Sequence, residues 1–248
     1  MALSRRTKIL GGVVAAVVAI LAVGGVLLWQ VFGSNAPEVV SLSSPKASGS
    51  VGSSASGVAT WGFAGTWTVD GTSGSLADGT STFAGYRVEE QLSTIGANVA
   101  VGRTQNVTGS MTIDGTTITA LSISVDMTTL RSDEDRRDES LRSRGLETDA
   151  FPTATFTLTQ PIDIGKRPAQ AERIEVTAVG DLTLHGVTKS VQVPIQAQVN
   201  GDEIEAVASV DVALADFQIT PPTGFLVLSI ADHGTIEMHL LFQKGSSS

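Results

Sequence analysis

The sequence Gly180-Asp-Leu-Thr-Leu-His-Gly-Val-Thr-Lys189, which continues as Ser190-Val-Gln-Val-Pro-Ile195, decides the fold of this chain. Apolar and polar residues alternate on both sides of His185-Gly186, and this period of two is typical of strands with one dry and one wet face. The stretch therefore predicts two long strands joined by a turn at His185.

The same alternation covers most of the chain from Trp61 to Lys244. Asn200-Gly201 and Asp114-Gly115 separate further alternating runs and suit hairpin turns, because such residues tolerate positive φ angles. The apolar positions shift from even to odd numbers near Ala120, which indicates a β-bulge. Antiparallel hairpins with a single dry face must close or stack to hide that face and their edges. The pattern predicts a barrel or a sandwich and leaves the choice between them open.

The segment from Arg131 to Glu147 breaks the alternation with a charged run, RSDEDRRDESLRSRGLE. It contains good helix formers, and Ser132 suits a helix start while Gly145 suits a helix end. We expect a short surface helix there, with Arg137-Asp138 fixing it to the strands.

The N-terminal part of the chain predicts a membrane anchor. Residues 1–8 carry Arg5, Arg6 and Lys8, whereas residues 9–32 contain no charged residue and are long enough to span a bilayer as a helix. The basic cluster places the N-terminus in the cytoplasm by the positive-inside rule. A cleaved signal peptide is the alternative, but its apolar region is usually about 7–15 residues. We therefore expect a single-pass protein of the cell membrane with its main domain outside.

The other segments differ in composition. Residues 33–60 are rich in Ser, Gly, Ala and Pro and have too few large apolar side chains to offset their ordering entropy, so they predict a flexible stalk. Residues 61–244 are expected to form the folded domain, and residues 245–248 a loose tail.

Charge and composition exclude several classes of function. The formal net charge is −9, from 16 basic and 25 acidic residues, which argues against nucleic acid as a partner. The chain has no cysteine, so it has no disulfide framework, thiolate metal ligand or cysteine nucleophile. It also lacks a Gly-x-Ser-x-Gly elbow and a glycine-rich phosphate loop with lysine. We expect no catalytic residue and no enzyme activity. A hydrolase or isomerase that uses His185 or His239 is the alternative, and it would need a polar cleft.

Three residues near the C-terminus have a spacing that could ligate zinc. His233, Glu237 and His239 share parity, so on a strand they face the same side. The residues that alternate with them are apolar, so we expect the His/Glu face to lie in water. The sequence therefore predicts no metal site.

Small residues recur at inward positions of the expected strands: Ala178, Gly180, Ala197, Ala206 and Ala208. In a packed core we would expect larger side chains at these positions. A barrel of about eight strands can hold one small ligand when its inward side chains are small. The alternative is that aromatic rings fill the space, and the candidates are Phe83, Phe156, Phe217, Phe225 and Phe242. The residues alone leave both interpretations open.

A series of motifs in fixed order resembles the YceI-like family of bacterial polyisoprenoid-binding proteins. The motifs are Trp67-Thr-Val-Asp70, Phe83-Ala-Gly-Tyr-Arg-Val88, Val107-Thr-Gly109, Val125-Asp-Met-Thr-Thr-Leu130, Arg137-Asp138, Phe151-Pro-Thr-Ala-Thr-Phe156 and Gly180 to Lys189, ending near Pro221. The resemblance implies an all-β fold, an antiparallel lipocalin-like barrel of about eight strands with a short surface helix, here preceded by the N-terminal transmembrane helix. It also implies a bound isoprenoid or quinone lipid, no other cofactor, and a homodimer.

This chain departs from the family where many members carry histidines near the opening strands. The corresponding positions here read Asp70-Gly-Thr-Ser-Gly-Ser75 and Tyr86-Arg87, so the headgroup of the ligand is in doubt. We expect the apolar lining at Phe83, Tyr86, Val88, Phe156, Leu158, Val176, Ala178, Leu182, Val193 and Ile195. Tyr86, Arg87 and His185 are the candidates for headgroup contact, although His185 suits a hydrogen bond to a turn carbonyl better.

Together these features predict a membrane-anchored, extracytoplasmic lipid-binding protein. It would hold a polyisoprenoid or isoprenoid-quinone chain in an apolar barrel, for storage or transfer. The alternative is a cell-envelope protein-interaction module with a filled barrel core and no ligand.

Overall fold

The computed structural model describes residues 36–44 and 62–245. The predicted anchor at residues 9–32, the cytoplasmic residues 1–8 and most of the predicted stalk lie outside these ranges. Within the described residues, no helix has the length and apolar character needed to cross a membrane.

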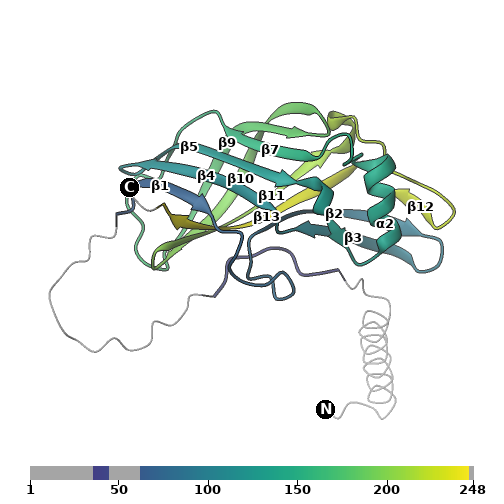
Figure 1. The fold of residues 1–248 in the computed structure, drawn as a ribbon, viewed down its shortest axis with the longest axis horizontal. Helices are drawn as coiled ribbons and strands as arrows, with labels where there is room; N and C mark the ends of the chain where they lie inside the picture. The colour runs from purple at the N-terminus through teal and green to yellow at the C-terminus, as the bar shows by residue number, and fades with distance from the viewer. Residues whose placement is uncertain (1–35, 45–61, 246–248) are drawn as a thin grey trace, which may run out of the picture.

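The described residues form a single sheet of thirteen strands, drawn in Figure 1. The strands are β1 (Gly65–Val69), β2 (Phe83–Leu92), β3 (Gly96–Thr104), β4 (Val107–Asp114), β5 (Thr117–Asp126), β6 (Arg131–Ser132), β7 (Thr153–Leu158), β8 (Ile162–Asp163), β9 (Arg173–Leu184), β10 (Val187–Asn200), β11 (Glu203–Ala213), β12 (Val227–Ile230) and β13 (His233–Lys244). The helical segments are α2 (Asp135–Ser140), a π-helical turn (Leu141–Gly145) and 3₁₀ turns at Met127–Thr129 and Leu214–Phe217.

Eight of these strands close into an antiparallel barrel in the order β1-β4-β5-β7-β9-β10-β11-β13, with β13 pairing back to β1. Closure removes the sheet edges that long hairpins would otherwise expose. The structure thus decides between barrel and sandwich in favour of the barrel that the family resemblance predicted. Strand β13 also pairs with β2. Beyond the closed ring, β2 pairs with β3 and β12, and β3 pairs with β6.

The hairpin of β9 and β10 confirms the interpretation of the stretch that decides the fold. The pairing runs from Leu184 opposite Val187, next to the turn, to Arg173 opposite Gln198, without a register shift. His185 and Gly186 form the two-residue turn with φ of 51° and 73°, which matches the right-handed twist of the strands. The predicted bulge is also present, since Thr112 pairs with Ala120 and the next residue pairs with Ile118.

The surface helix is shorter than the predicted segment Arg131–Glu147. Arg131 and Ser132 pair with β3 instead of starting the helix, because the edge of β3 offers backbone partners there. Arg137 donates to Glu90 on β2 at 2.7 Å, which fixes α2 to the strands as expected. Asp138 also fixes α2 to the strands, because its Oδ1 accepts from the backbone N–H and the hydroxyl of Ser132 on β6.

Trp67 on β1 lies at the point where the barrel closes. Its side chain is fully buried, and its indole N–H donates to the carbonyl of Phe63 at 2.9 Å. β1 is held between β4 and β13, so this ring secures the closing pairing from the inside.

We expect Trp67→Ala to lower the free energy of unfolding by about 3–5 kcal/mol, because it removes a large buried ring and leaves a cavity. The matched control is Thr68→Ala, the exposed neighbour on the same strand, which should change it by about 0.5 kcal/mol or less. Denaturant unfolding measures both. Equal costs for the two variants would contradict the closing role of Trp67.

Candidate functional site

The barrel interior contains an apolar cavity of about 140 Å³ at the end where α2 packs, called here the helix-end cavity. Its wall comes from eight strands and from the segments next to the helix. Its main side chains are Tyr86, Val88, Ile123, Val125, Leu141, Leu146, Ala154, Phe156, Leu182, Leu184, Val191, Val193, Val210, Val212, Pro221, Pro222, Ile230, Ile236 and Met238. Several inward-facing residues, Val191, Val210 and Ile236 among them, remain only half-buried. Their partial exposure inside the wall shows that side chains do not fill this end of the barrel.

A second apolar space of about 70 Å³ lies toward the other end of the barrel, called here the turn-end cavity. Ile113, Ile162, Val176, Ile195 and Phe242 are among its lining residues. Four side chains border both cavities and form the partition between them: Ile123, Phe156, Val193 and Met238.

Phe156 fills the space that Gly180 leaves open. A Cβ atom added at Gly180 would lie 2.4 Å from Cζ of Phe156, so the ring occupies the place of a side chain on β9. The predicted aromatic filling therefore holds for Phe156, and Phe242 also reaches the interior. It does not hold for Phe225, which is 91% exposed. The interior is hollow at both ends, and the Phe156 ring belongs to the partition in the middle.

Most of the predicted lining residues lie on the cavity walls. Tyr86, Val88 and Leu182 border the helix-end cavity, Val176 and Ile195 border the turn-end cavity, and Phe156 and Val193 border both. Ala178 is fully buried in the core beside them, and Leu158 packs against the same core without bordering either space.

Phe83 does not line the interior, so its prediction was wrong. Strand alternation places Tyr86 and Val88 inside, and a residue of opposite parity on β2 must face outward. The ring of Phe83 stacks on His239 at 5.7 Å between centroids and lies under the guanidinium of Arg103 at 4.4 Å.

Like Arg87, Tyr86 is a predicted headgroup contact that borders the helix-end cavity. Its ring lies against Gly102, where an added Cβ would meet the ring at 2.4 Å, so only glycine permits this placement. Its hydroxyl is buried without a hydrogen-bond partner among the described residues. Burial raises the pKa of Tyr86 well above its ordinary value, so the phenol stays neutral and offers a hydrogen bond.

The other two headgroup candidates have different roles. The Arg87 side chain points to the outer face, where Nε pairs with Glu237 at 2.8 Å and Nη2 donates to the carbonyl of Pro37. His185 contacts the carbonyl of Phe217 at 3.0 Å and the carboxylate of Glu147 at 2.9 Å through its two ring nitrogens. Both nitrogens are engaged, so His185 holds the turn in place, as the structural interpretation expected.

The outer face of β11 and β13 is not solvated, contrary to the prediction for the His/Glu face. Glu237 is fully buried and His239 is 3% exposed. Residues 36–44, called here the strap, and the loop of residues 71–82 lie across this face. His233 alone of the three predicted residues is exposed. Alternation along a strand cannot show that a distant segment covers its polar side.

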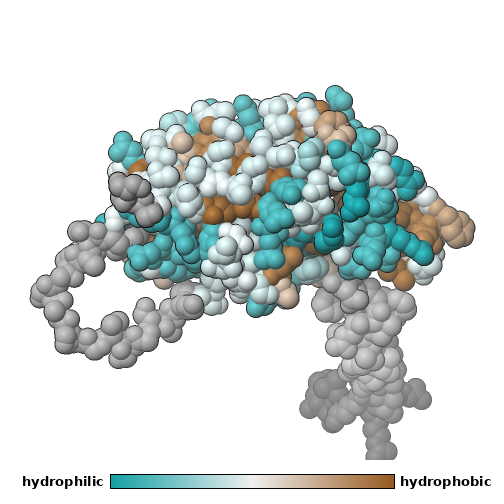
Figure 2. All heavy atoms as spheres, viewed as in Figure 1, coloured by the Kyte–Doolittle hydropathy of each residue, from teal (hydrophilic) through white to brown (hydrophobic). Residues whose placement is uncertain are grey.

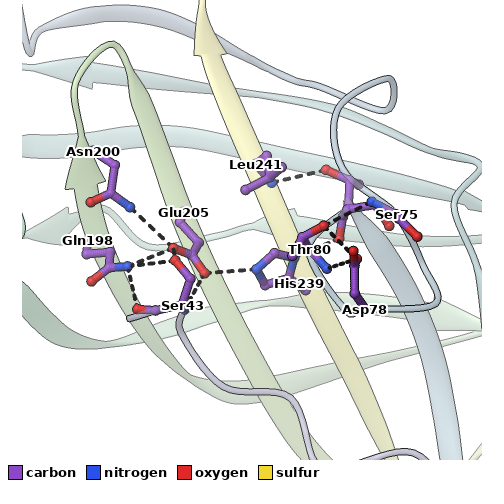
Figure 3. Close-up of polar contacts among 11 residues, drawn as sticks. Ser43, Ser75, Asp78, Thr80, Gln198, Asn200, Glu205, His239 and Leu241 are labelled. Atoms are coloured by element: carbon purple, nitrogen blue, oxygen red, sulfur yellow. Dashed lines mark hydrogen bonds and ion pairs between the residues drawn. The ribbon is translucent and has the colours of Figure 1, made fainter. Parts of the chain in front are cut away.

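Beneath the strap, Glu205, His239, Gln198 and Ser43 form a buried group, called here the outer polar cluster (Figure 3). Glu205 accepts from the backbone N–H and the hydroxyl of Ser43 at 2.7 and 2.6 Å. His239 lies between Glu205 at 3.0 Å and the carbonyl of Ser81 at 2.7 Å. Ser43 therefore donates to the carboxylate and not to the imidazole, so the arrangement does not activate the serine as a nucleophile.

Within the outer polar cluster, Glu205 on β11 pairs with His239 on β13, and the hydrogen bonds from Ser43 to Glu205 join the strap to the barrel. Burial disfavours the charged ring of His239, but the hydrogen bonds with Glu205 and the Ser81 carbonyl, together with the negative charge of Glu205, outweigh this and raise the pKa of His239. Burial likewise opposes the charge of Glu205, yet the hydrogen bonds from His239 and Ser43 lower its pKa to about 2. Among the described residues, no group of three or more His, Asp or Glu side chains could hold a metal ion.

These shifts give the stability of the protein a pH dependence with a defined sign. The contribution of Glu205 is present above its ordinary pKa of 4.5 and is lost as the pH falls toward 2. That of His239 is complete below its ordinary pKa of 6.5 and is lost as the pH rises through the raised value. We expect the stability difference between the natural chain and His239→Gln in denaturant unfolding to shrink as the pH rises above 6.5 and through the raised pKa of His239. His233→Gln is the control: Asp232 raises the pKa of His233 too, but the pair is exposed to solvent, so its pH dependence should have the same sign and be smaller. A difference for His239→Gln that stays constant with pH would contradict this assignment.

The comparisons with known proteins agree with this architecture. The YceI-like domain family matches residues 67–242. The chain belongs to this family. A UPF0312 protein of Vibrio vulnificus is 28% identical over 159 residues, which cover 60% of this chain and 77% of that protein, and one from Shewanella baltica is 32% identical over 116 residues, covering 46% and 57%.

Two solved structures share the fold of this YceI-like chain. A polyisoprenoid binding domain from Saccharophagus degradans, implicated in plant cell wall breakdown, superposes with a TM-score of 0.55 at 16% identity, covering 72% of this chain and 98% of that domain. BcnA of Burkholderia cenocepacia superposes with a TM-score of 0.50 at 18% identity, covering 70% and 98%.

Proposed function

We propose that this YceI-like barrel binds the chain of a polyisoprenoid or isoprenoid quinone in its interior and stores or transfers it. The observation that carries the proposal is the pair of apolar cavities along the barrel axis, whose walls place aliphatic and aromatic side chains inward. Arg87, the one charged residue at the helix-end wall, turns its guanidinium to the outer face. The solved structure from Saccharophagus degradans, described as a polyisoprenoid binding domain, supports the same class of ligand.

The energetics favour a long apolar chain over a small ligand. Each methylene moved from water into the barrel contributes about 0.8 kcal/mol, so the free energy of binding grows with the length of chain enclosed. A chain longer than the helix-end cavity must turn Phe156 aside to reach the turn-end cavity. Gly180 beside the ring leaves no side chain to lock it from β9.

Filling the helix-end cavity from its wall tests the proposal. We expect Val191→Phe to weaken binding of an added isoprenoid alcohol at least about tenfold, because the new ring takes the place of about two chain methylenes. Gln192→Phe adds the same ring to the outward, exposed side of β10 and should leave binding unchanged. Native mass spectrometry of residues 36–248 with the added isoprenoid measures the bound fraction. Equal binding by both variants would place the ligand elsewhere.

For the headgroup, we propose a neutral oxygen, as in an alcohol or a quinone carbonyl, that meets the hydroxyl of Tyr86. The unpartnered hydroxyl supports this choice, and the described lining turns no cation inward that could neutralise a phosphate.

Tyr86→Phe separates a ligand role from a structural one. Because the hydroxyl lacks a partner in the free protein, we expect the free energy of unfolding to stay equal or rise. Affinity for the isoprenoid should fall about 3–10-fold, the value of one neutral hydrogen bond. Loss of stability without loss of affinity would assign Tyr86 to packing alone.

The membrane part of the proposal rests on the sequence of residues 9–32, which would hold the barrel outside the membrane with the N-terminus in the cytoplasm. The homodimer implied by the family resemblance stays a prediction. The second candidate is an interaction module with a filled core, and the packing of Phe156 across the interior favours it. A barrel that takes up no added isoprenoid would support this candidate.

A further inference from the structure

One end of the barrel exposes a group of large apolar side chains, called here the apolar tip: Ile95, Phe225, Leu226 and Leu228. Five large apolar side chains are exposed among the described residues, and four of them lie here. Phe225 is 91% exposed. Figure 2 shows apolar surface at the end of the molecule where Figure 1 labels β12. An exposed apolar patch of this kind marks an interaction site.

The fold holds the apolar tip in place. β12 pairs with the end of β2, with Val227 opposite Leu92. The backbone N–H of Ser93, in the turn between β2 and β3, donates to the carbonyl of Leu226 at 2.9 Å. Gly224 N–H donates to the carbonyl of Val227, which closes the turn that presents Phe225. The exposure of these side chains is therefore built by backbone pairing on two hairpins.

The apolar tip continues the wall of the helix-end cavity. Pro221 and Pro222 precede it and Ile230 follows it, and all three line that cavity. Val88 on β2 belongs to the same wall, and it lies two residues before Glu90, where the pairing of β2 with β12 begins. A lipid chain that leaves the cavity past these residues meets the apolar tip next.

The position of the strap limits the distance between the apolar tip and the predicted anchor. Arg87 holds the carbonyl of Pro37 against β2. The uncharged residues 9–32 end five peptide links before Pro37, a span of at most about 18 Å. From Arg87 to Leu92 the strand covers about 17 Å toward the tip. A bilayer that contains residues 9–32 therefore lies within reach of the apolar tip.

We propose that the apolar tip inserts into the outer leaflet of the bilayer and passes a lipid chain between the bilayer and the helix-end cavity. This inference rests on the proposed lipid-binding function. The tip has no basic side chain, and the chain carries a formal net charge of −9, so insertion depends on apolar contact and not on anionic lipids.

The absence of native cysteine allows a direct test on the full chain. A single Phe225→Cys variant carries an environment-sensitive fluorophore, and the chain is reconstituted in phosphatidylcholine vesicles. We expect a blue-shifted emission that brominated lipids quench and aqueous iodide does not. Asp202→Cys, in the exposed turn between β10 and β11 at the other end of the barrel, is the control and should behave in the opposite way.

Two results would overturn the inference. A label at position 225 that iodide reaches as readily as the label at position 202 shows a tip in water. A label shielded from both iodide and brominated lipids shows a tip buried against a second copy or another protein.

A transfer measurement separates failure of the tip from failure of the lipid site. Phe225→Asp with Leu228→Asp should slow uptake of an isoprenoid alcohol from donor vesicles at least about tenfold, because two apolar contacts with the bilayer are lost. Equilibrium uptake of the same alcohol from detergent solution should not change. Unchanged uptake from vesicles contradicts the tip alone, whereas no uptake by the natural chain under either condition contradicts the lipid site.

Discussion

The closure of the sheet through β13 is the constraint on which the other features depend. This strand pairs with β11 along its length, with β1 near its C-terminal end and with β2 near its N-terminal end. The closed ring turns one face of eight strands inward, and small residues on that face leave two apolar spaces on either side of Phe156. The switch of partner along β13 also frees β2 and β3 to extend past the ring and carry the apolar tip. One pairing pattern thus creates both the cavity and the apolar tip beside it.

The same strand carries an outer side that a soluble barrel would leave in water. Here the strap and the loop of residues 71–82 bury it, and burial of the charges of Glu205 and Glu237 is tolerable only because each meets cationic partners and hydrogen-bond donors. His239 joins this face to the loop through Ser81, and Ser43 joins it to the strap. The same charged residues hold the strap against the barrel, since Glu205 accepts from Ser43, and Arg87 and Arg103 donate to the carbonyls of Pro37 and Glu38.

The sequence was informative where the signal is local. The β9–β10 hairpin, the Asp114-Gly115 turn and the bulge near Ala120 follow from alternation and turn chemistry, and the inward positions of Val176, Leu182 and Val193 follow from parity. Other features depend on contacts between distant segments. Phe83 and His239 face outward and are nevertheless buried, because residues 36–44 cover them. The composition of that segment had indicated a flexible stalk. Phe156 on β7 packs on Gly180 of the neighbouring strand β9, and neither residue alone indicates this contact in the sequence. The Tyr86 ring, which carries the unpartnered hydroxyl, fits in its place only because residue 102 on the neighbouring strand β3 is a glycine.

The central claim is that the barrel encloses one isoprenoid chain, and the lipid that copurifies with the protein tests it most directly. Residues 36–248 retain the strap and can be purified from bacteria without detergent, weighed by native mass spectrometry and extracted with solvent. We expect one isoprenoid alcohol or quinone per barrel, released on denaturation. A protein of uncombined mass that no added isoprenoid shifts would contradict it and would favour a filled barrel that acts through its surface.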